Sequence, residues 1–103
     1  MEEQRPPRLY VIVRANMTRS QQAIQAGHGV AKFVKEFPDV WGNRTLLYLR
    51  TSDETELLQW YSKLSGMTDK VVMYLDPSWN SNTAVAAFGT PEVMEAVKGL
   101  SLI

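Results

Sequence analysis

The run Leu9–Val13 constrains the fold of this chain more than any other feature. It reads Leu-Tyr-Val-Ile-Val, a nearly continuous apolar stretch that is rich in β-branched residues. A strand with one face in water alternates apolar and polar residues, whereas a strand buried on both faces has a run of this kind. The run therefore predicts a strand in a sheet that helices cover on both sides.

Three further short apolar segments predict strands, and segments with a helical pattern separate them. The additional predicted strands are Thr45–Leu49, Val71–Leu75 and Ala84–Phe88, with a turn-rich connection at residues 76–82. Strands that alternate with helices indicate an α/β layer structure. We therefore expect an α/β fold, a three-layer α/β/α sandwich with a four-stranded sheet.

The longest helical pattern follows the first strand and runs to Phe37, where Pro38 stops it. Its apolar residues recur at three- and four-residue steps and predict the side that faces the core: Ala23, Ala26, Val30, Phe33 or Val34, and Phe37. A polar stripe is predicted on the opposite side: Gln21, Gln25, His28, Lys32 and Lys35. Such a stripe fits either a solvated helix face or a functional site.

Two glycines, Gly27 and Gly29, flank His28 inside this helix. Each costs roughly 1 kcal/mol relative to alanine. We therefore expect something to approach the helix backbone closely at this point, either a neighbouring strand or loop, or a substrate.

Two later helices also have recognisable ends. Asp53 is expected to cap a second helix that Gly66 ends, and Thr90-Pro91-Glu92 begins a short third helix with proline in its first turn.

The composition excludes several classes of site. The chain has no Cys, which excludes a disulfide, a thiol nucleophile and a Cys-ligated metal, and its single His argues against a multi-histidine metal site. We expect no metal and no cofactor. No apolar run approaches the ~20 residues of a membrane span, so we expect a cytoplasmic protein with no membrane partner. Residues 1–7 are expected to be a flexible lead-in to a single domain at residues 8–103.

The charge is balanced overall but not along the chain. Residues 1–52 contain eight basic and four acidic residues, whereas residues 53–103 contain three basic and seven acidic residues. This division leaves open a basic surface that binds a polyanion, although chance segregation on a solvated surface would give the same counts.

Several short segments, in the same order along the chain, resemble the archaeal and eukaryotic type of peptidyl-tRNA hydrolase. Gln25–Ala31 (Gln-Ala-Gly-His-Gly-Val-Ala) is similar to the family signature Ala-Gln-Cys-Ser-His-Ala-Ala, and it follows a strand that ends Val-Ile-Val-Arg where the family has Val-Val-Arg. Thr83–Gly89 looks like the family strand Thr-Val-Leu-Ala-Ile-Gly. Val97–Leu102 resembles the closing Val-Thr-Gly-His-Leu-Lys-Leu.

Two departures from the family pattern lie outside these segments. The helix opens with Thr18-Arg19-Ser20-Gln21 where the family has Gly-Lys-Gly-Lys. The family motif Asp-Ala-Gly-Arg-Thr-Gln before the last strand is missing, and Asp76 is the one possible counterpart of its carboxylate. These departures keep open a second hypothesis, a non-catalytic homologue that binds tRNA or a protein.

The resemblance implies a mixed sheet in the strand order 2-1-4-3, with the last strand antiparallel to the others. It also implies hydrolysis of the ester that joins a peptide to the 3′ end of tRNA, with peptidyl-tRNA or tRNA as partner and a possible homodimer. His28 would position or deprotonate the water, Asp76 would orient His28 or the water, and Gln25 and Thr83 would hydrogen-bond the substrate. Phosphates or other parts of the tRNA would contact Arg14, Arg19, Gln21, Lys32 and Lys35.

Simpler structural roles remain open for three of these positions. Asp76-Pro77 fits the start of a turn, and Thr83 fits the first position of a strand. Trp79 fits either stacking on the terminal adenine of tRNA or packing over the edge of the protein's own core.

Overall fold

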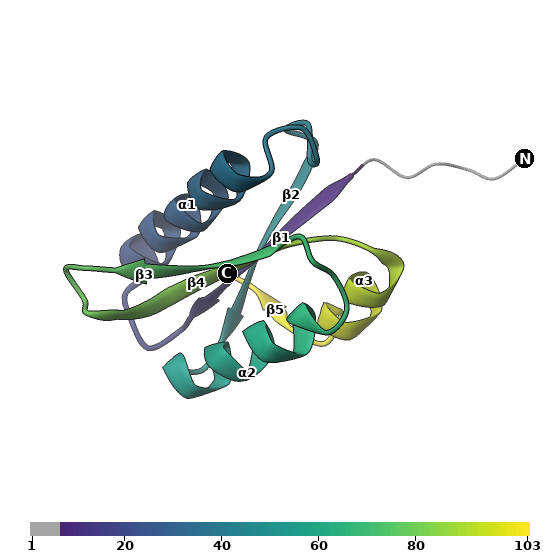
Figure 1. Ribbon diagram of the computed structural model, residues 1–103. Helices are drawn as coiled ribbons and strands as arrows, with labels where there is room; N and C mark the ends of the chain where they lie inside the picture. The colour runs from purple at the N-terminus through teal and green to yellow at the C-terminus, as the bar shows by residue number, and fades with distance from the viewer. Residues whose placement is uncertain (1–6) are drawn as a thin grey trace, which may run out of the picture.

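The computed structural model describes residues 7–103, which form three helices and a five-stranded sheet (Figure 1). Residues 1–6, most of the predicted lead-in, lie outside the described residues. The elements in chain order are β1 (Arg8–Arg14), α1 (Arg19–Glu36), β2 (Thr45–Thr51), α2 (Glu54–Ser65), β3 (Val71–Asp76), β4 (Ser81–Phe88), α3 (Pro91–Val97) and β5 (Ser101–Leu102).

The sheet is mixed and has the strand order β3-β4-β1-β2-β5. β1 and β2 are parallel, β4 is antiparallel to both β1 and β3, and β5 is antiparallel to β2. The predicted number of four strands is therefore wrong, because a fifth strand extends the sheet beyond β2; the first four strands lie in the predicted order, 2-1-4-3 read from β2. β5 has two residues, too few for a recognisable periodicity, and it is held to its neighbour by the pairs Leu49↔Leu102 and Arg50↔Ser101.

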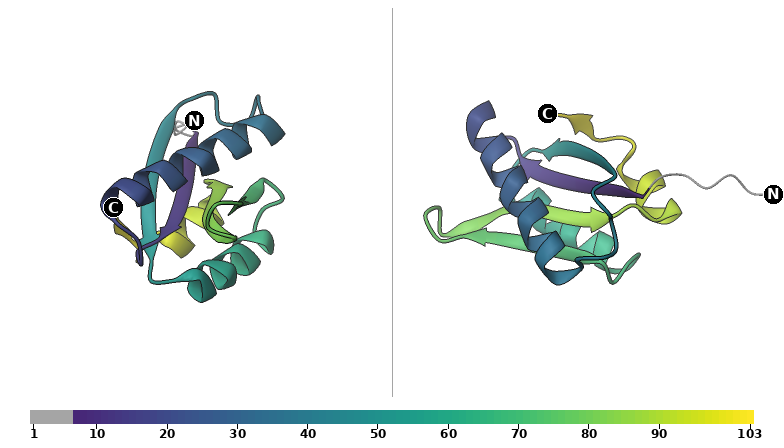
Figure 2. Two further views of the ribbon diagram at one scale, coloured as in Figure 1. Left: turned by 90° about the vertical axis from the view of Figure 1, so that its left-hand side faces the viewer. Right: turned by 90° about the horizontal axis from the view of Figure 1, so that it is seen from above.

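The helices cover both faces of the sheet, as the opening run predicts. α1 lies on one face, and α2 and α3 lie on the other (Figures 1 and 2). β1 contributes to both cores: Leu9, Val11 and Val13 pack on the α1 side, and Tyr10 and Ile12 pack on the α2 side. None of these five side chains is more than 5% exposed.

The predicted helix ends at Asp53, Gly66 and Thr90 are confirmed. The side chain of Asp53 accepts a hydrogen bond from the Glu56 amide, Gly66 is the C-cap of α2, and Thr90 caps α3. The predicted inner side of α1 is confirmed at Ala26 and Phe33, which are fully buried.

The inner side of α1 is narrower than predicted. Ala23 is exposed, and Val34 is 39% exposed while its neighbour Phe33 is buried. The side of α1 that faces the sheet also contains Gln22 and Gln25, which the hydrophobic pattern could not identify as buried.

The predicted connection at residues 76–82 is a tight hairpin. β3 extends through Asp76 and β4 already begins at Ser81, so residues 77–80 form the turn. Asn80 has a φ of 50°, a left-handed conformation that asparagine tolerates better than most residues. Polar residues continue β4 because distant side chains hold them: the guanidinium of Arg14 donates to Ser81 Oγ (2.8 Å), and the Asn82 amide donates to Glu54 (2.8 Å).

The two glycines of α1 differ in their surroundings. A Cβ placed on Gly29 would lie 3.0 Å from Val11 Cγ1 and 3.2 Å from Ala84 Cβ, whereas a Cβ on Gly27 would meet nothing within 4 Å. Gly29 therefore lets α1 pack closely on β1 and β4, which is the strand approach that the sequence left open. Close packing at this point brings the preceding turn of α1, with Gln25, down onto the ends of β3 and β4.

Candidate functional site

A buried polar group joins α1, β3 and β4. The Gln25 amide Nε2 donates to Asp76 Oδ2 at 2.7 Å, and Gln25 Oε1 accepts from the Thr83 hydroxyl at 2.6 Å. The exposed fractions are 3% for Gln25, 7% for Asp76 and 0% for Thr83. Three residues that are far apart in the sequence therefore form one connected network, which we call the Gln25–Asp76–Thr83 group.

The position of Gln25 corrects the predicted polar stripe. Gln25 does not lie opposite the apolar face of α1; it belongs to the buried side, with Ala26, Gly29 and Phe33. A glutamine is buried there because β3 and β4 supply a partner for each end of its amide, which removes the penalty for desolvating an unpaired polar group.

A β-bulge places Thr83 in this group. The register of β3 against β4 shifts between Tyr74, which pairs with Ala84, and Leu75, which pairs with Asn82, so Thr83 has no partner on β3. Regular alternation along β4 would put Thr83 on the same face as Val85, which packs on the α2 side. The bulge instead lets its hydroxyl reach Gln25 on the α1 side, the kind of re-aiming that bulges produce beside functional sites. Thr83 is thus not the first residue of its strand.

The environment of Asp76 favours its ionised form. The hydrogen bond from Gln25 lowers the pKa of Asp76 below its ordinary value, the backbone amides of Ser78 and Trp79 and a positive charge on His28 act in the same direction, and desolvation opposes them. The Ser78 amide donates to Asp76 Oδ1 at 2.8 Å. Asp76 therefore both starts the turn and supplies a fixed negative charge next to His28.

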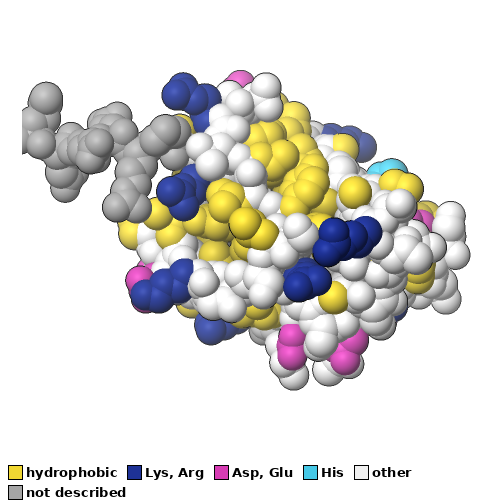
Figure 3. All heavy atoms as spheres, turned by 180° about the vertical axis from the view of Figure 1, so that it is seen from behind, with side chains coloured by type: hydrophobic (Ala, Val, Ile, Leu, Met, Phe, Trp, Pro, Cys, Tyr) yellow, Lys and Arg dark blue, Asp and Glu magenta, His cyan; other side chains and the backbone are white. Residues whose placement is uncertain are grey.

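His28 lies at the surface beside this group and stacks on Tyr74. The two rings are nearly parallel, with their centroids 4.7 Å apart and an interplanar angle of 8°. His28 is exposed, and the one histidine of the sequence is visible as the cyan surface in Figure 3. Stacking fixes the plane of the imidazole and leaves its nitrogen atoms at the ring edge free to bind a water or a substrate atom.

Tyr74 was not among the site residues predicted from the sequence. The two-residue repeat of a β-strand could have identified it, because this repeat puts Val72, Tyr74 and Asp76 on the same face of β3. Once Asp76 is placed beside α1, the same alternation places Tyr74 beside the next turn of α1, where His28 lies.

Arg14 is held beside the β3–β4 hairpin at the end of β1. Its guanidinium donates to Ser81 Oγ and to Asn16 Oδ1, and it lies 5.7 Å from the ring centroid of Trp79. Trp79 is 37% exposed, so it neither packs into the core nor stands free of the protein. Arg14 therefore stabilises the hairpin that carries Asp76, and a role in phosphate binding stays a prediction.

The other residues that the resemblance assigned to tRNA occupy the outside of α1. Gln21 forms a capping box with Thr18. The side-chain Oε1 of Gln21 accepts from the backbone amide of Thr18, and the backbone amide of Gln21 donates to Thr18 Oγ1. Arg19 and Lys35 are exposed, and Lys32 lies 3.9 Å from Glu36. The structure thus brings together Gln25, His28, Asp76 and Thr83, and it places the cations around them at the surface.

The larger hollows of the surface lie elsewhere. A cavity of about 980 Å³ is bounded by α3 and the sheet and lined mainly by apolar side chains such as Leu47, Met94 and Leu100, and none of the predicted catalytic residues lines it. We place the candidate site at the polar group because it joins three elements in one buried network, whereas the polar side chains at the other hollow form two separate pairs, Arg8 with Tyr10 and Lys98 with Glu95. Within residues 7–103, no cluster of three His, Asp or Glu side chains could hold a metal ion, and no helix is long and apolar enough to span a membrane.

Comparison with known proteins identifies the fold and no function. No family model and no curated protein matches the chain. A solved structure of a protein of unknown function from Agrobacterium tumefaciens is similar, with a TM-score of 0.64 and 14% sequence identity; the match covers 97% of this chain and 99% of that chain. At this identity the likeness extends to the fold alone.

Proposed function

We propose that the protein is a peptidyl-tRNA hydrolase-like enzyme, which hydrolyses the ester between a peptide and the 3′ end of tRNA. The observation that carries the proposal is the Gln25–Asp76–Thr83 group with His28 beside it. Ionised Asp76 lies near an exposed histidine, and histidine is the side-chain type that serves most often as a general base. A carboxylate beside a histidine base is one arrangement that hydrolytic enzymes use.

The reaction needs a base for water and donors for the developing oxyanion. A His28 nitrogen takes a proton from a water molecule as the water oxygen bonds to the ester carbonyl carbon. When the carbonyl re-forms, the carbon–oxygen bond to the ribose breaks, and the proton passes to the ribose oxygen. The products are tRNA with its 3′ hydroxyl and the free peptide, whose new carboxylic acid releases the second water proton to solvent and becomes a carboxylate.

The remaining residues of the site have roles that follow from their contacts. Ionised Asp76 lies close enough to His28 to stabilise the positive charge that forms on the imidazole during the reaction. Gln25 Nε2 carries two hydrogens, and Asp76 takes one of them; we propose that the substrate carbonyl reaches the second through the 3% of Gln25 that is exposed. Thr83 holds the amide in this orientation. General base catalysis typically contributes 10²–10⁴-fold, and oxyanion donors contribute comparably.

A second function, a non-catalytic tRNA- or protein-binding module on the same fold, is favoured by one specific observation. Each member of the Gln25–Asp76–Thr83 group already has a partner inside the protein, so the group also works as a structural tie between α1 and the hairpin. Only measured turnover separates the two functions.

The experiment is release of peptide from an N-blocked aminoacyl-tRNA by the purified protein, compared with a blank and with two variants. We expect turnover above the blank, a loss of about 10²-fold or more in His28→Ala, and native turnover in Lys98→Ala, an exposed position at the end of α3. Native protein at the level of the blank would refute the enzyme and leave the binding module. Full activity in His28→Ala would refute the site.

A further inference from the structure

One flank of α1 runs alongside β3. Outward from the Gln25–Asp76–Thr83 group, aromatic and then basic side chains line this flank and the neighbouring strand. The contacts pair the two elements in opposite order: Gln25 with Asp76, then His28 with Tyr74, then Phe37 with Lys70. β3 is the edge strand of the sheet on this side. The seam between α1 and β3 therefore leads outward from the candidate catalytic group along the surface.

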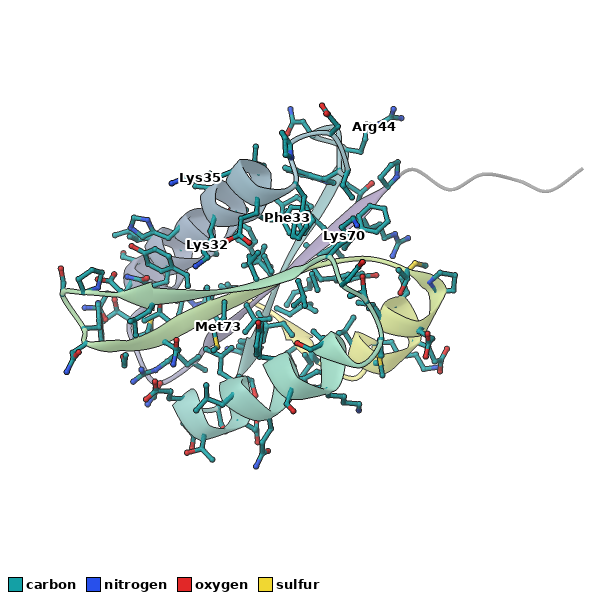
Figure 4. All side chains as sticks on the ribbon, in the orientation of Figure 1. Lys32, Phe33, Lys35, Arg44, Lys70 and Met73 are labelled. Carbon is teal, nitrogen blue, oxygen red and sulfur yellow. The ribbon has the colours of Figure 1, made fainter. Side chains whose placement is uncertain are left out.

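The far end of this seam is basic. Lys32 and Lys35 project from α1, and Lys70 lies immediately before β3 with its Nζ 5.5 Å from the centroid of the Phe37 ring (Figure 4). Two acidic residues lie near them: Glu36 is 3.9 Å from Lys32, and Asp69 is 3.4 Å from Lys70. Both lysines are half-buried and their acidic partners are exposed, so water screens both pairs, the carboxylates hold the ammonium groups weakly, and a phosphate can take their place.

The near end of the seam offers a stacking surface. Tyr74 backs the His28 ring, and His28 is exposed. A nucleic-acid base stacks on aromatic faces with little dependence on its identity, and a groove that binds single strands combines such faces with cations along the backbone path. Stacking on the ring face leaves the nitrogens at the ring edge available.

The length of the seam distinguishes a single strand from a duplex. Tyr74 lies four positions after Lys70 along the chain, about 13 Å at the rise of a β-strand. A helical turn of duplex spans about 34 Å, far more than the seam provides. The seam therefore fits a short unpaired segment.

We propose that the α1–β3 seam binds the single-stranded 3′ end of the RNA, with the terminal base stacked on the His28–Tyr74 pair and the preceding phosphates on Lys32, Lys35 and Lys70. This inference rests on the proposed function, because it takes the ligand to be the RNA that carries the ester. It adds Lys70 to the binding residues and Tyr74 as the residue that positions the His28 ring. It also sets the direction of the strand: the 3′ end lies at Asp76 and the chain leaves toward Lys70. The ribose that carries the ester then lies next to the edge of the imidazole.

The test uses a fluorescent single-stranded RNA that ends in CCA with a free 3′ hydroxyl, titrated into the full chain at several salt concentrations. Lys32→Gln and Lys70→Gln should each weaken binding several-fold and reduce the salt slope by about 0.7, the value for one phosphate of a single strand. Lys63→Gln, on α2 across the sheet, is the matched control and should bind as the native protein does.

The stacking contact is tested with two substitutions of one residue. Tyr74→Phe keeps the aromatic face and should bind RNA normally, whereas Tyr74→Leu removes it while still filling the space, and should weaken binding about fivefold or more. Thermal unfolding of each variant checks that it is folded. The RNA affinity of Tyr74→Leu is compared with that of Lys32→Gln and Lys70→Gln, because these two lysines lie at the surface and their substitution does not disturb the core.

The outcomes separate this inference from the proposed function. RNA binding that depends on Lys70 and Tyr74, without ester cleavage, supports the seam and refutes the hydrolase. Ester cleavage with an unchanged KM in Lys70→Gln refutes the seam and leaves the hydrolase. Equal binding of RNA by Lys70→Gln and Lys63→Gln overturns the inference, as does equally tight binding of a poly-glutamate peptide, which would indicate a protein partner at the edge of β3.

Discussion

Gln25 is the residue on which the candidate site depends. Its amide is the link between a carboxylate on β3 and a hydroxyl on β4, and both of its hydrogen bonds are buried. Buried donors and acceptors are costly when one partner is removed, because the other loses its hydrogen bond without regaining water. The geometry of the site is therefore tied to the stability of the protein.

Thr83→Val tests this link at a single hydroxyl. The substitution keeps the shape of the side chain and leaves Gln25 Oε1 without its donor, so the free energy of unfolding should fall by about 1–3 kcal/mol. Urea unfolding measures the change, and Thr55→Val, at an exposed position of α2, is the control. A loss no larger in Thr83→Val than in the control would contradict the account.

Asp76 should make stability depend on pH in the acid range. Its pKa is lowered in the folded protein, first by the hydrogen bond from Gln25, so folding favours the ionised carboxylate. The stabilisation is fully present above the ordinary pKa of 3.8 and is lost as the pH falls through the lower folded-state value. Asp76→Asn should therefore flatten the fall in the free energy of unfolding below about pH 4, measured by urea titration at several pH values.

The control for this pH effect is Asp69→Asn, whose side chain is 89% exposed, and which should leave the acid branch unchanged. Some pH dependence should persist in Asp76→Asn, because hydrogen bonds from Thr51 and Ser52 also lower the pKa of Glu56. An acid branch that is identical in Asp76→Asn and in the native protein would show that the hydrogen bond does not favour the ionised form.

At the scale of the element, α1 is positioned by one of its two glycines. Gly29 lies against Val11 and Ala84, and Gly27 faces open space, although the sequence presents them as equivalent neighbours of His28. The close approach at Gly29 is what lets Gln25 reach two strands at once.

Alanine at each glycine separates these roles. Gly27→Ala should raise the free energy of unfolding by up to about 1 kcal/mol, because alanine favours the helix and meets no neighbour. Gly29→Ala gains the same helix propensity but pushes α1 against Val11, so it should be less stable than Gly27→Ala. Thermal or urea unfolding compares the two variants directly. Equal gains in both would refute the close packing.

The sequence predicted the elements that local signals define. The caps Asp53 and Thr90 and the breaker Gly66 act within a few residues, and the strand over residues 9–13 follows from its own apolar run. β5 was missed because two residues carry no pattern, and the early start of β4 was missed because Arg14 and Glu54 hold its polar residues from other elements.

The candidate site was predictable in its members more than in its geometry. The family resemblance pointed to Gln25, His28, Asp76 and Thr83, and the structure places them together. The burial of Gln25 and the bulge at Thr83 could not be predicted, because both depend on partners brought together by the fold and neither changes a local periodicity.

At the scale of the molecule, charge is divided between the two helical layers. α1 carries three basic residues and one acidic residue, whereas α2 and α3 together carry one basic and four acidic residues. The unequal halves of the sequence therefore correspond in part to opposite faces of the sheet. A polyanion would be attracted to the α1 layer and repelled from the other, which is the face preference that the proposed function needs.

Binding of native protein to tRNA should accordingly weaken with salt. If Lys32, Lys35 and Lys70 each neutralise one phosphate of a single strand, the logarithm of the affinity should fall against the logarithm of the salt concentration with a slope of about −2. Fluorescence titration over a range of salt concentrations measures the slope. A flat response would exclude a phosphate-binding surface and with it both tRNA functions.

The most direct measurement for the central claim, that His28 and Asp76 form one hydrolytic unit, is a double-mutant cycle in kcat/KM for peptide release from blocked aminoacyl-tRNA. We predict that His28→Ala lowers kcat/KM by about 10²–10⁴-fold, that Asp76→Asn also lowers it, and that the double variant is little slower than His28→Ala alone. The account would be contradicted if the reduction in kcat/KM of the double variant equalled the product of the two single reductions, or if either single variant kept native activity.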